Sequence, residues 1–131
     1  MRASELWLFL PFGYLLTVLC ETPVLLAGLS ARHPLRRKLF AGLWLTACTY
    51  PVVILVLPLV MSGASRAAYL WVAEIFAPLA ECVLFWSAFG ARDERGRASM
   101  WRDFAAITTA NVLSFAAGEL LSAYGWFDFL R

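Results

Sequence analysis

Four long apolar blocks, separated by short polar segments, constrain this chain more than any other feature. We expect them to form helices at about residues 7–29, 39–61, 69–90 and 104–124. Each block matches the stretch of about 20 helical residues that crosses the hydrocarbon core of a bilayer. The pattern predicts an all-α, polytopic integral membrane protein, a four-helix transmembrane bundle that forms one domain over residues 1–131.

Composition favours the same class. Hydrophobic residues make up 62% of the chain and charged residues 15%, whereas soluble domains are about 45–50% apolar and about 25% charged. The basic residues lie beside apolar blocks, as in membrane proteins, so the lipid bilayer is the expected partner and nucleic acid is not. A homo-oligomer and a larger membrane complex both remain open, and the sequence indicates no cofactor.

The distribution of basic residues predicts the orientation. The first and third loops hold eight of them: Arg32, Arg36, Arg37, Lys38, Arg92, Arg95, Arg97 and Arg102. The termini and the second loop hold three: Arg2, Arg66 and Arg131. Because cytoplasmic loops carry an excess of Lys and Arg, we expect loops 30–38 and 91–103 in the cytoplasm. Both termini would then lie outside a plasma membrane or a bacterial inner membrane.

Four glutamates lie inside the apolar blocks: Glu21, Glu74, Glu81 and Glu119. An ionised side chain at the bilayer centre costs at least about 2.5 kcal/mol, so such residues are functional candidates. At about 1.5 Å of rise per residue, Glu21 and Glu81 lie within roughly 5 Å of the midplane. Glu74 and Glu119 lie roughly 6–8 Å toward the outside. We expect no Lys or Arg at these depths.

Neutral polar residues accompany the carboxylates on one face of each predicted helix. We expect Thr46, Thr49 and Asn111 to act as neutral ligands beside the glutamates. The other members of these faces are Gly13, Thr17, Gly42, Thr108 and Gly118. If these faces turn inward, the carboxyls share one interior. There they can be protonated, bind a metal or organic cation, or pair with a basic residue of another protein.

Two further patterns concern packing. Four prolines lie well inside the predicted helices and predict kinks, because proline removes a backbone donor: Pro23, Pro51, Pro58 and Pro78. Small residues recur at every fourth position of the last block: Ala106, Ala110, Ser114, Gly118 and Ser122. Such a stripe lets helices approach closely in lipid. The sequence does not say whether the neighbouring helix belongs to the same chain.

Other candidate chemistry is sparse. Cys20, Cys48 and Cys82 lie at a similar estimated depth and are candidate ligands for a soft metal, although buried cysteine often behaves as a small hydrophobe. The only histidine, His33, lies among arginines, and we expect it to be solvated. Ser114 has no histidine or lysine at its depth to activate it, so we interpret it as a packing residue.

The leading hypothesis is a small transporter-like protein that handles protons or cations. Glu21 and Glu81 would form its central site, with Glu74 and Glu119 on the outer side. One alternative is an accessory subunit of a larger membrane complex, whose carboxylates pair with a partner's basic groups. Another is an intramembrane enzyme that acts on lipid with its carboxylates as acid and base. The missing nucleophile motif favours a non-enzyme.

Overall fold

The structure, a computed structural model, describes residues 3–90 and 94–125, and every regular element in this part is helical. The helices are α1 (Ala3–Gly28), α2 (Leu35–Pro51), η1 (Val52–Val56), α3 (Leu57–Val60), α4 (Arg66–Phe89) and α5 (Glu94–Ala123). The segments α2, η1 and α3 follow one another directly, so they form one long helix with a π-helical middle. Within the described residues there are thus four helices that are long and apolar enough to cross a membrane.

The helices begin earlier than the apolar blocks do. The predicted starts at residues 7, 39, 69 and 104 were too late, since the helices begin at 3, 35, 66 and 94. The charged segment 94–103, expected to be loop, forms the first turns of α5. Hydropathy detects the apolar part of a helix, whereas arginine, alanine and methionine continue a helix well without being part of that block. Arg2, Arg92, Trp126 and Arg131 lie outside the described residues.

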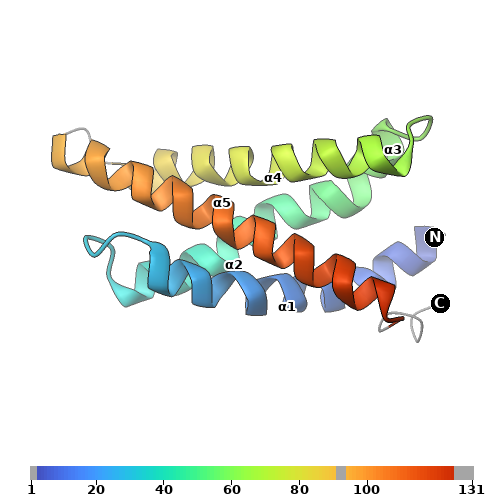
Figure 1. Ribbon diagram of the computed structural model, residues 1–131, viewed down its shortest axis with the longest axis horizontal. Helices are drawn as coiled ribbons and strands as arrows, with labels where there is room; N and C mark the ends of the chain where they lie inside the picture. The colour runs from blue at the N-terminus through green and yellow to red at the C-terminus, as the bar shows by residue number, and fades with distance from the viewer. Residues whose placement is uncertain (1–2, 91–93, 126–131) are drawn as a thin grey trace.

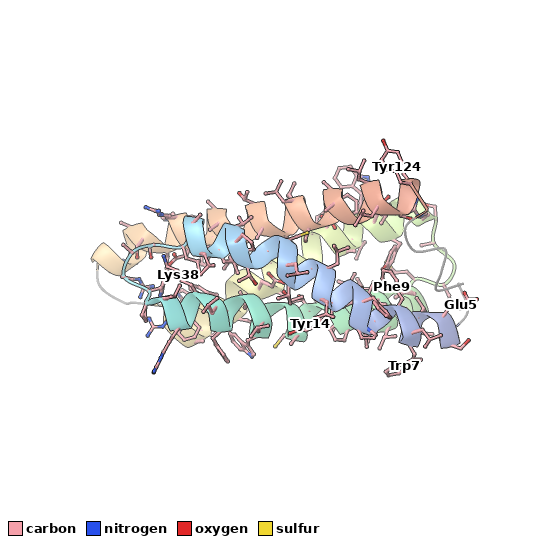
Figure 2. The ribbon with its side chains drawn as sticks, turned by 90° about the horizontal axis from the view of Figure 1, so that it is seen from below. Glu5, Trp7, Phe9, Tyr14, Lys38 and Tyr124 are labelled. Carbon is pink, nitrogen blue, oxygen red and sulfur yellow. The ribbon has the colours of Figure 1, made fainter. Side chains whose placement is uncertain are left out.

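Short turns make successive helices antiparallel, so the bundle has two distinct ends (Figure 1). The basic end comprises the turn 29–34 and the starts of α2 and α5. The terminal end comprises the start of α1, the turn 61–65 and residues 124–125. Figure 2 shows Lys38 at the basic end and Glu5, Trp7 and Tyr124 at the other.

The four long helices form a ring. Helix α1 packs against α2 and α5, and α4 packs against the same two helices, so α1 and α4 face each other across the bundle. Of the stripe of small residues on α5, Ala106 and Ala110 are buried within the chain, whereas Gly118 and Ser122 line a cavity. Gly28 lies so close to Ala106 that an added Cβ would crowd it, which shows how closely α1 and α5 approach.

The apolar core fills only the half of the bundle next to the basic end. It consists of residues near the end of α1, the start of α2, the end of α4 and the start of α5: Leu25, Leu29, Ala41, Leu45, Phe85, Ala106, Ile107 and Ala110. Most other large apolar side chains face outward, and only 17–22% of each helix's apolar window is buried. A bundle with so much apolar surface outside is suited to a lipid environment.

In the π-helical segment, one backbone carbonyl lacks a donor from its own helix and accepts a hydrogen bond from α4 instead. The N–H of Leu57 donates to the carbonyl of Val52, five residues back. The next donor in this register would be Pro58, which has no N–H, so the carbonyl of Val53 lacks its helical partner. The hydroxyl of Tyr69 donates to that carbonyl at 2.7 Å. The helix interruption is thus satisfied from across the bundle.

This arrangement predicts the effect of Tyr69→Phe. The exchange keeps the ring but leaves the carbonyl of Val53 without a donor. The cost is about 1–3 kcal/mol for a fully buried group and less for this partly buried one. Thermal unfolding in detergent, followed by circular dichroism, should show a lower Tm for Tyr69→Phe. The control is Tyr124→Phe, at an exposed tyrosine of the same end, which should unfold like wild type. Equal Tm values for both variants would contradict the account.

Candidate functional site

A cavity of about 530 Å³ occupies the half of the bundle that the core leaves unfilled. All four long helices line it, from its closed end near Glu21 and Glu81 to Arg66 and Glu119 toward the terminal end. Most of its wall is apolar or aromatic. The aromatic members are Phe9, Tyr50, Tyr69 and Phe115.

Glu21 projects from α1 into the closed end of the cavity and is 2% exposed. Two hydroxyls, one from each neighbouring helix, contact its two carboxyl oxygens. Thr46 of α2 donates from Oγ1 to Oε2 at 3.0 Å, and Ser114 of α5 donates from Oγ to Oε1 at 2.7 Å. The carboxyl group is therefore fixed between α2 and α5.

Glu81 takes the corresponding position on α4, and it is also 2% exposed. Thr49 of α2 donates from Oγ1 to its Oε1 at 2.7 Å, and Asn111 of α5 donates from Nδ2 to its Oε2 at 2.7 Å. The two helices that bind Glu21 thus also bind Glu81. Thr46, Thr49 and Asn111, expected as neutral partners of the carboxyls, all contact them.

The hydrogen-bond partners of Glu21 and Glu81 occur in opposite order along α2 and along α5. On α2 the partner of Glu21 lies one turn nearer the basic end than the partner of Glu81. On α5 this order is reversed. Because α2 and α5 run in the same direction, this opposite order brings both carboxyls to about the same level of the bundle. Their position agrees with the shared depth that the sequence predicts.

The hydroxyls beside the carboxyls each have two acceptors within reach. Thr46 Oγ1 lies 3.0 Å from Glu21 Oε2 and 3.0 Å from the carbonyl of Gly42 in its own helix. Thr49 and Ser114 repeat this arrangement, each with a carbonyl of its own helix at 3.0 Å. A hydroxyl donates one hydrogen bond and accepts others. Each can donate to an ionised carboxyl, or accept from a protonated one while donating to its own backbone.

Asn111 restricts where a proton can sit on Glu81. Its amide group carries two hydrogens, so it donates to Glu81 Oε2 and, at 3.0 Å, to the carbonyl of Ile107 at the same time. Because Oε2 of Glu81 accepts a hydrogen bond from this amide, it is not the oxygen that carries the proton. The proton of a neutral Glu81 therefore belongs on Oε1, where the Thr49 hydroxyl can accept it.

The outer carboxyls differ from the inner pair. Glu119 is paired with Arg66, whose guanidinium lies 3.1 Å from Oε1 and 3.2 Å from Oε2. No Lys or Arg was expected at the depth of these carboxyls, but the long Arg66 side chain extends from the first residue of α4 and reaches Glu119. Glu74 is half-buried in the cavity wall between the inner pair and this ion pair, and no hydrogen bond joins it to another described residue.

Tyr50 is a further polar group of the cavity wall. Its hydroxyl is buried and has no hydrogen-bond partner among the described residues. It lies against Gly13, where any larger residue would overlap the tyrosine. Gly13 therefore makes room for this hydroxyl. The sequence places Gly13 on a polar face but does not indicate the tyrosine, since an aromatic residue in an apolar block resembles its neighbours.

The cysteines do not form a common group in the cavity. Cys48 is exposed on the outside of α2, while Cys20 and Cys82 are partly buried. No group of three or more His, Cys, Asp or Glu side chains within residues 3–90 and 94–125 is arranged to hold a metal ion. Ser114, interpreted from the sequence as packing, belongs to the carboxyl site, whereas Thr108 is exposed.

A second buried polar cluster closes the basic end. His33 is 2% exposed, so the expectation that it is solvated was wrong. Its Nε2 lies 2.8 Å from Asp103 Oδ2, and Arg37 donates to its Nδ1 at 3.2 Å. Because an arginine can only donate, Nδ1 accepts and the ring proton sits on Nε2. Asp103 also accepts from the N–H of Ser30 at 2.7 Å, so the turn 29–34 is fastened to α5.

No protein-family model matches this chain, and neither a curated protein nor a solved structure is significantly similar to it. The assignment of a function therefore depends on the geometry described above.

The basic-end cluster predicts a pH-dependent stability. Burial lowers the pKa of His33 below its ordinary value; Asp103 partly opposes this shift, and Arg32 and Arg37 reinforce it. The folded state thus disfavours the imidazolium, so stability is retained at neutral pH and falls as the pH drops below about 6.5. Thermal unfolding from pH 8 to pH 5.5 should show a larger loss of Tm for wild type than for His33→Gln. A wild-type Tm that rises toward acid relative to the variant would show the opposite shift.

Proposed function

We propose that this chain is a polytopic integral membrane protein whose four long helices cross the bilayer, with its basic end in the cytoplasm. The outward-facing apolar side chains and the length of the four helices support the membrane location. The concentration of Lys and Arg at the basic end supports the orientation. Trp7 and Tyr124, which lie at the opposite end, suit the outer interface (Figure 2).

We further propose that the cavity exchanges protons for a cation at Glu21 and Glu81, as in a small proton-coupled transporter. In the empty state the carboxyls are protonated, because two adjacent ionised groups in an apolar bundle are costly. A cation that enters from the terminal end replaces the protons and leaves the carboxyls ionised. The core and the buried cluster around His33 close the other end in the conformation described.

The hydroxyls beside the carboxyls are the observation that carries this proposal. Thr46, Thr49 and Ser114 can each satisfy a carboxyl group in either protonation state by rotation alone. Glutamates that only bond helices together need one protonation state and one donor arrangement. A site that changes its charge needs partners that can reverse their hydrogen bonds without leaving a buried polar atom unsatisfied.

The alternative functions have less support. In a subunit that docks through ion pairs, the carboxyls should face outward, yet Glu21 and Glu81 face the interior of their own bundle. In a lipid-directed enzyme the carboxyls would act as acid and base. Ser114 does contact the Glu21 carboxyl at 2.7 Å, but the usual activating base of a nucleophilic serine is a histidine or a lysine. The only histidine and the only lysine of the chain both lie at the basic end, His33 in the turn 29–34 and Lys38 at the start of α2.

Flux through reconstituted protein tests the exchange. We expect wild-type proteoliposomes to release protons, read by an enclosed pH dye, when at least one of Na⁺, K⁺ and benzylammonium is added outside. Glu21→Gln and Glu81→Gln should each lower this flux at least tenfold, because an amide cannot bind or release the proton. The matched control is Glu5→Gln, an acid of the terminal end that does not line the cavity. Wild-type flux in both inner variants would remove the proposal.

Cysteine accessibility tests the orientation. In a variant without Cys20, Cys48 and Cys82, a new cysteine at Gly63 in the turn 61–65 should react with an impermeant maleimide on intact cells. A cysteine at Arg36, at the basic end, should react only after the cells are permeabilised. Reversed labelling would place the basic end outside, and labelling of both sites in intact cells would contradict a single orientation.

A further inference from the structure

We propose that the cation handled by the cavity is an organic ammonium with an apolar body, bound with its ammonium group at Glu21 and Glu81. This inference rests on the proton–cation exchange proposed above and names the substrate class of that site. Four features of the cavity carry it: its size, the separation of its polar and apolar surfaces, its aromatic wall and the arginine at its outer end.

Size separates an organic ligand from a bare ion. The cavity encloses about 530 Å³, whereas one water molecule occupies about 30 Å³ in the liquid. Sites for small organic molecules are typically clefts of about 300–1,000 Å³ with mostly apolar walls and a few polar groups. A Na⁺ or K⁺ ion would use the closed end and leave most of the cavity to water. The apolar wall of the cavity is suited to contact the carbon skeleton of an organic ligand.

The polar groups are arranged for a molecule with one charged end. Glu21 and Glu81 lie with their hydroxyl and amide partners at the closed end of the cavity. Between this end and the opening the wall also contains Glu74, but most of it is leucine, valine, isoleucine and aromatic side chains: Phe9, Leu16, Val53, Ile54, Leu70 and Phe115. An amphipathic cation that enters with its charge first can satisfy both surfaces at once. An inorganic ion can satisfy only the first.

The tyrosines add a preference for an ammonium group. Aromatic rings attract cations through their faces, most strongly where water is excluded. Tyr50 and Tyr69 both line the cavity, and the Tyr50 hydroxyl is a buried polar atom without a partner. The Tyr50 hydroxyl packs against Gly13, about two turns of α1 away from Glu21, and the Tyr69 hydroxyl donates to the carbonyl of Val53. The rings of these tyrosines, rather than their hydroxyls, are therefore the groups that can contact an ammonium ligand.

The outer end of the cavity already contains a cationic side chain, that of Arg66. The Arg66 guanidinium lines the cavity and binds both carboxyl oxygens of Glu119. Glu74 lies between this ion pair and the inner carboxyls and has no hydrogen-bond partner among the described residues. Because Arg66 already pairs with Glu119, the first carboxyl open to the ammonium group of an entering ligand is Glu74, and Glu21 and Glu81 follow. The wall thus offers a carboxyl group at each stage.

A tail-length series tests the substrate class on the full chain in detergent. Calorimetric titrations in two buffers of different ionisation enthalpy give both the affinity and the number of protons released. The probes are methylammonium, butylammonium and benzylammonium, with benzyl alcohol as the uncharged analogue and Na⁺ and K⁺ as bare ions. We expect benzylammonium to bind at least tenfold more tightly than methylammonium and to release protons. Benzyl alcohol should release none.

Gly118→Leu tests where the apolar body lies. Gly118 lines the cavity, and a Cβ added there meets no atom within 4 Å, so a larger side chain starts in open space and can extend into the cavity. We expect at least a tenfold loss of benzylammonium affinity, with methylammonium unchanged. The matched control is Gly63→Leu, where an added Cβ also meets nothing within 4 Å but the residue is in the turn outside the cavity. It should bind benzylammonium like wild type.

The outcomes separate this inference from the proposed function. If Na⁺, K⁺ or methylammonium releases protons as well as benzylammonium does, and tail length and Gly118→Leu have no effect, the substrate class is wrong and the exchange stands. If no probe releases protons, the exchange itself fails and the inference fails with it. If Gly118→Leu does not fold, the tail-length series on wild type decides alone.

Discussion

Two carboxyl groups buried at one level of an apolar bundle are the constraint on which the rest of this structure depends. A carboxyl in such surroundings needs a hydrogen-bond partner for each oxygen, and it must avoid a neighbouring negative charge. Glu21 and Glu81 come from opposite helices, and α2 and α5 supply partners to both. The four helices are therefore linked through their polar groups at the level where the apolar core ends.

The division of the bundle into a filled and an open half follows from where its side chains lie. Toward the basic end, leucine, phenylalanine and alanine fill the interior, and the cluster around His33 and Asp103 fastens the turn 29–34 to α5. Toward the terminal end, Gly118 leaves space, Gly13 accommodates the Tyr50 hydroxyl, and the π-helical segment is anchored to α4 by Tyr69. One end is thereby closed, while the other is suited to admit a ligand.

Much of the fold and part of the site could be predicted from the sequence, for reasons of periodicity. Four apolar blocks predict four long helices, and a helical spacing of three or four residues places Thr46 and Thr49, or Asn111 and Ser114, on one face. That rule cannot show a contact that depends on turn geometry or side-chain length. The burial of His33 follows from the path of the turn 29–34, and the pairing of Arg66 with Glu119 follows from a long side chain at a helix start. Whether the glutamates bind a cation stays a prediction.

Infrared difference spectroscopy on the empty protein at neutral pH tests the central claim most directly, because a protonated carboxyl absorbs apart from an ionised one. The account predicts a protonated-carboxyl band that weakens when benzylammonium is added, and that is reduced in Glu21→Gln and Glu81→Gln but not in Glu5→Gln. A spectrum in which the inner carboxyls are ionised without any cation, or in which their band does not respond to one, would contradict it.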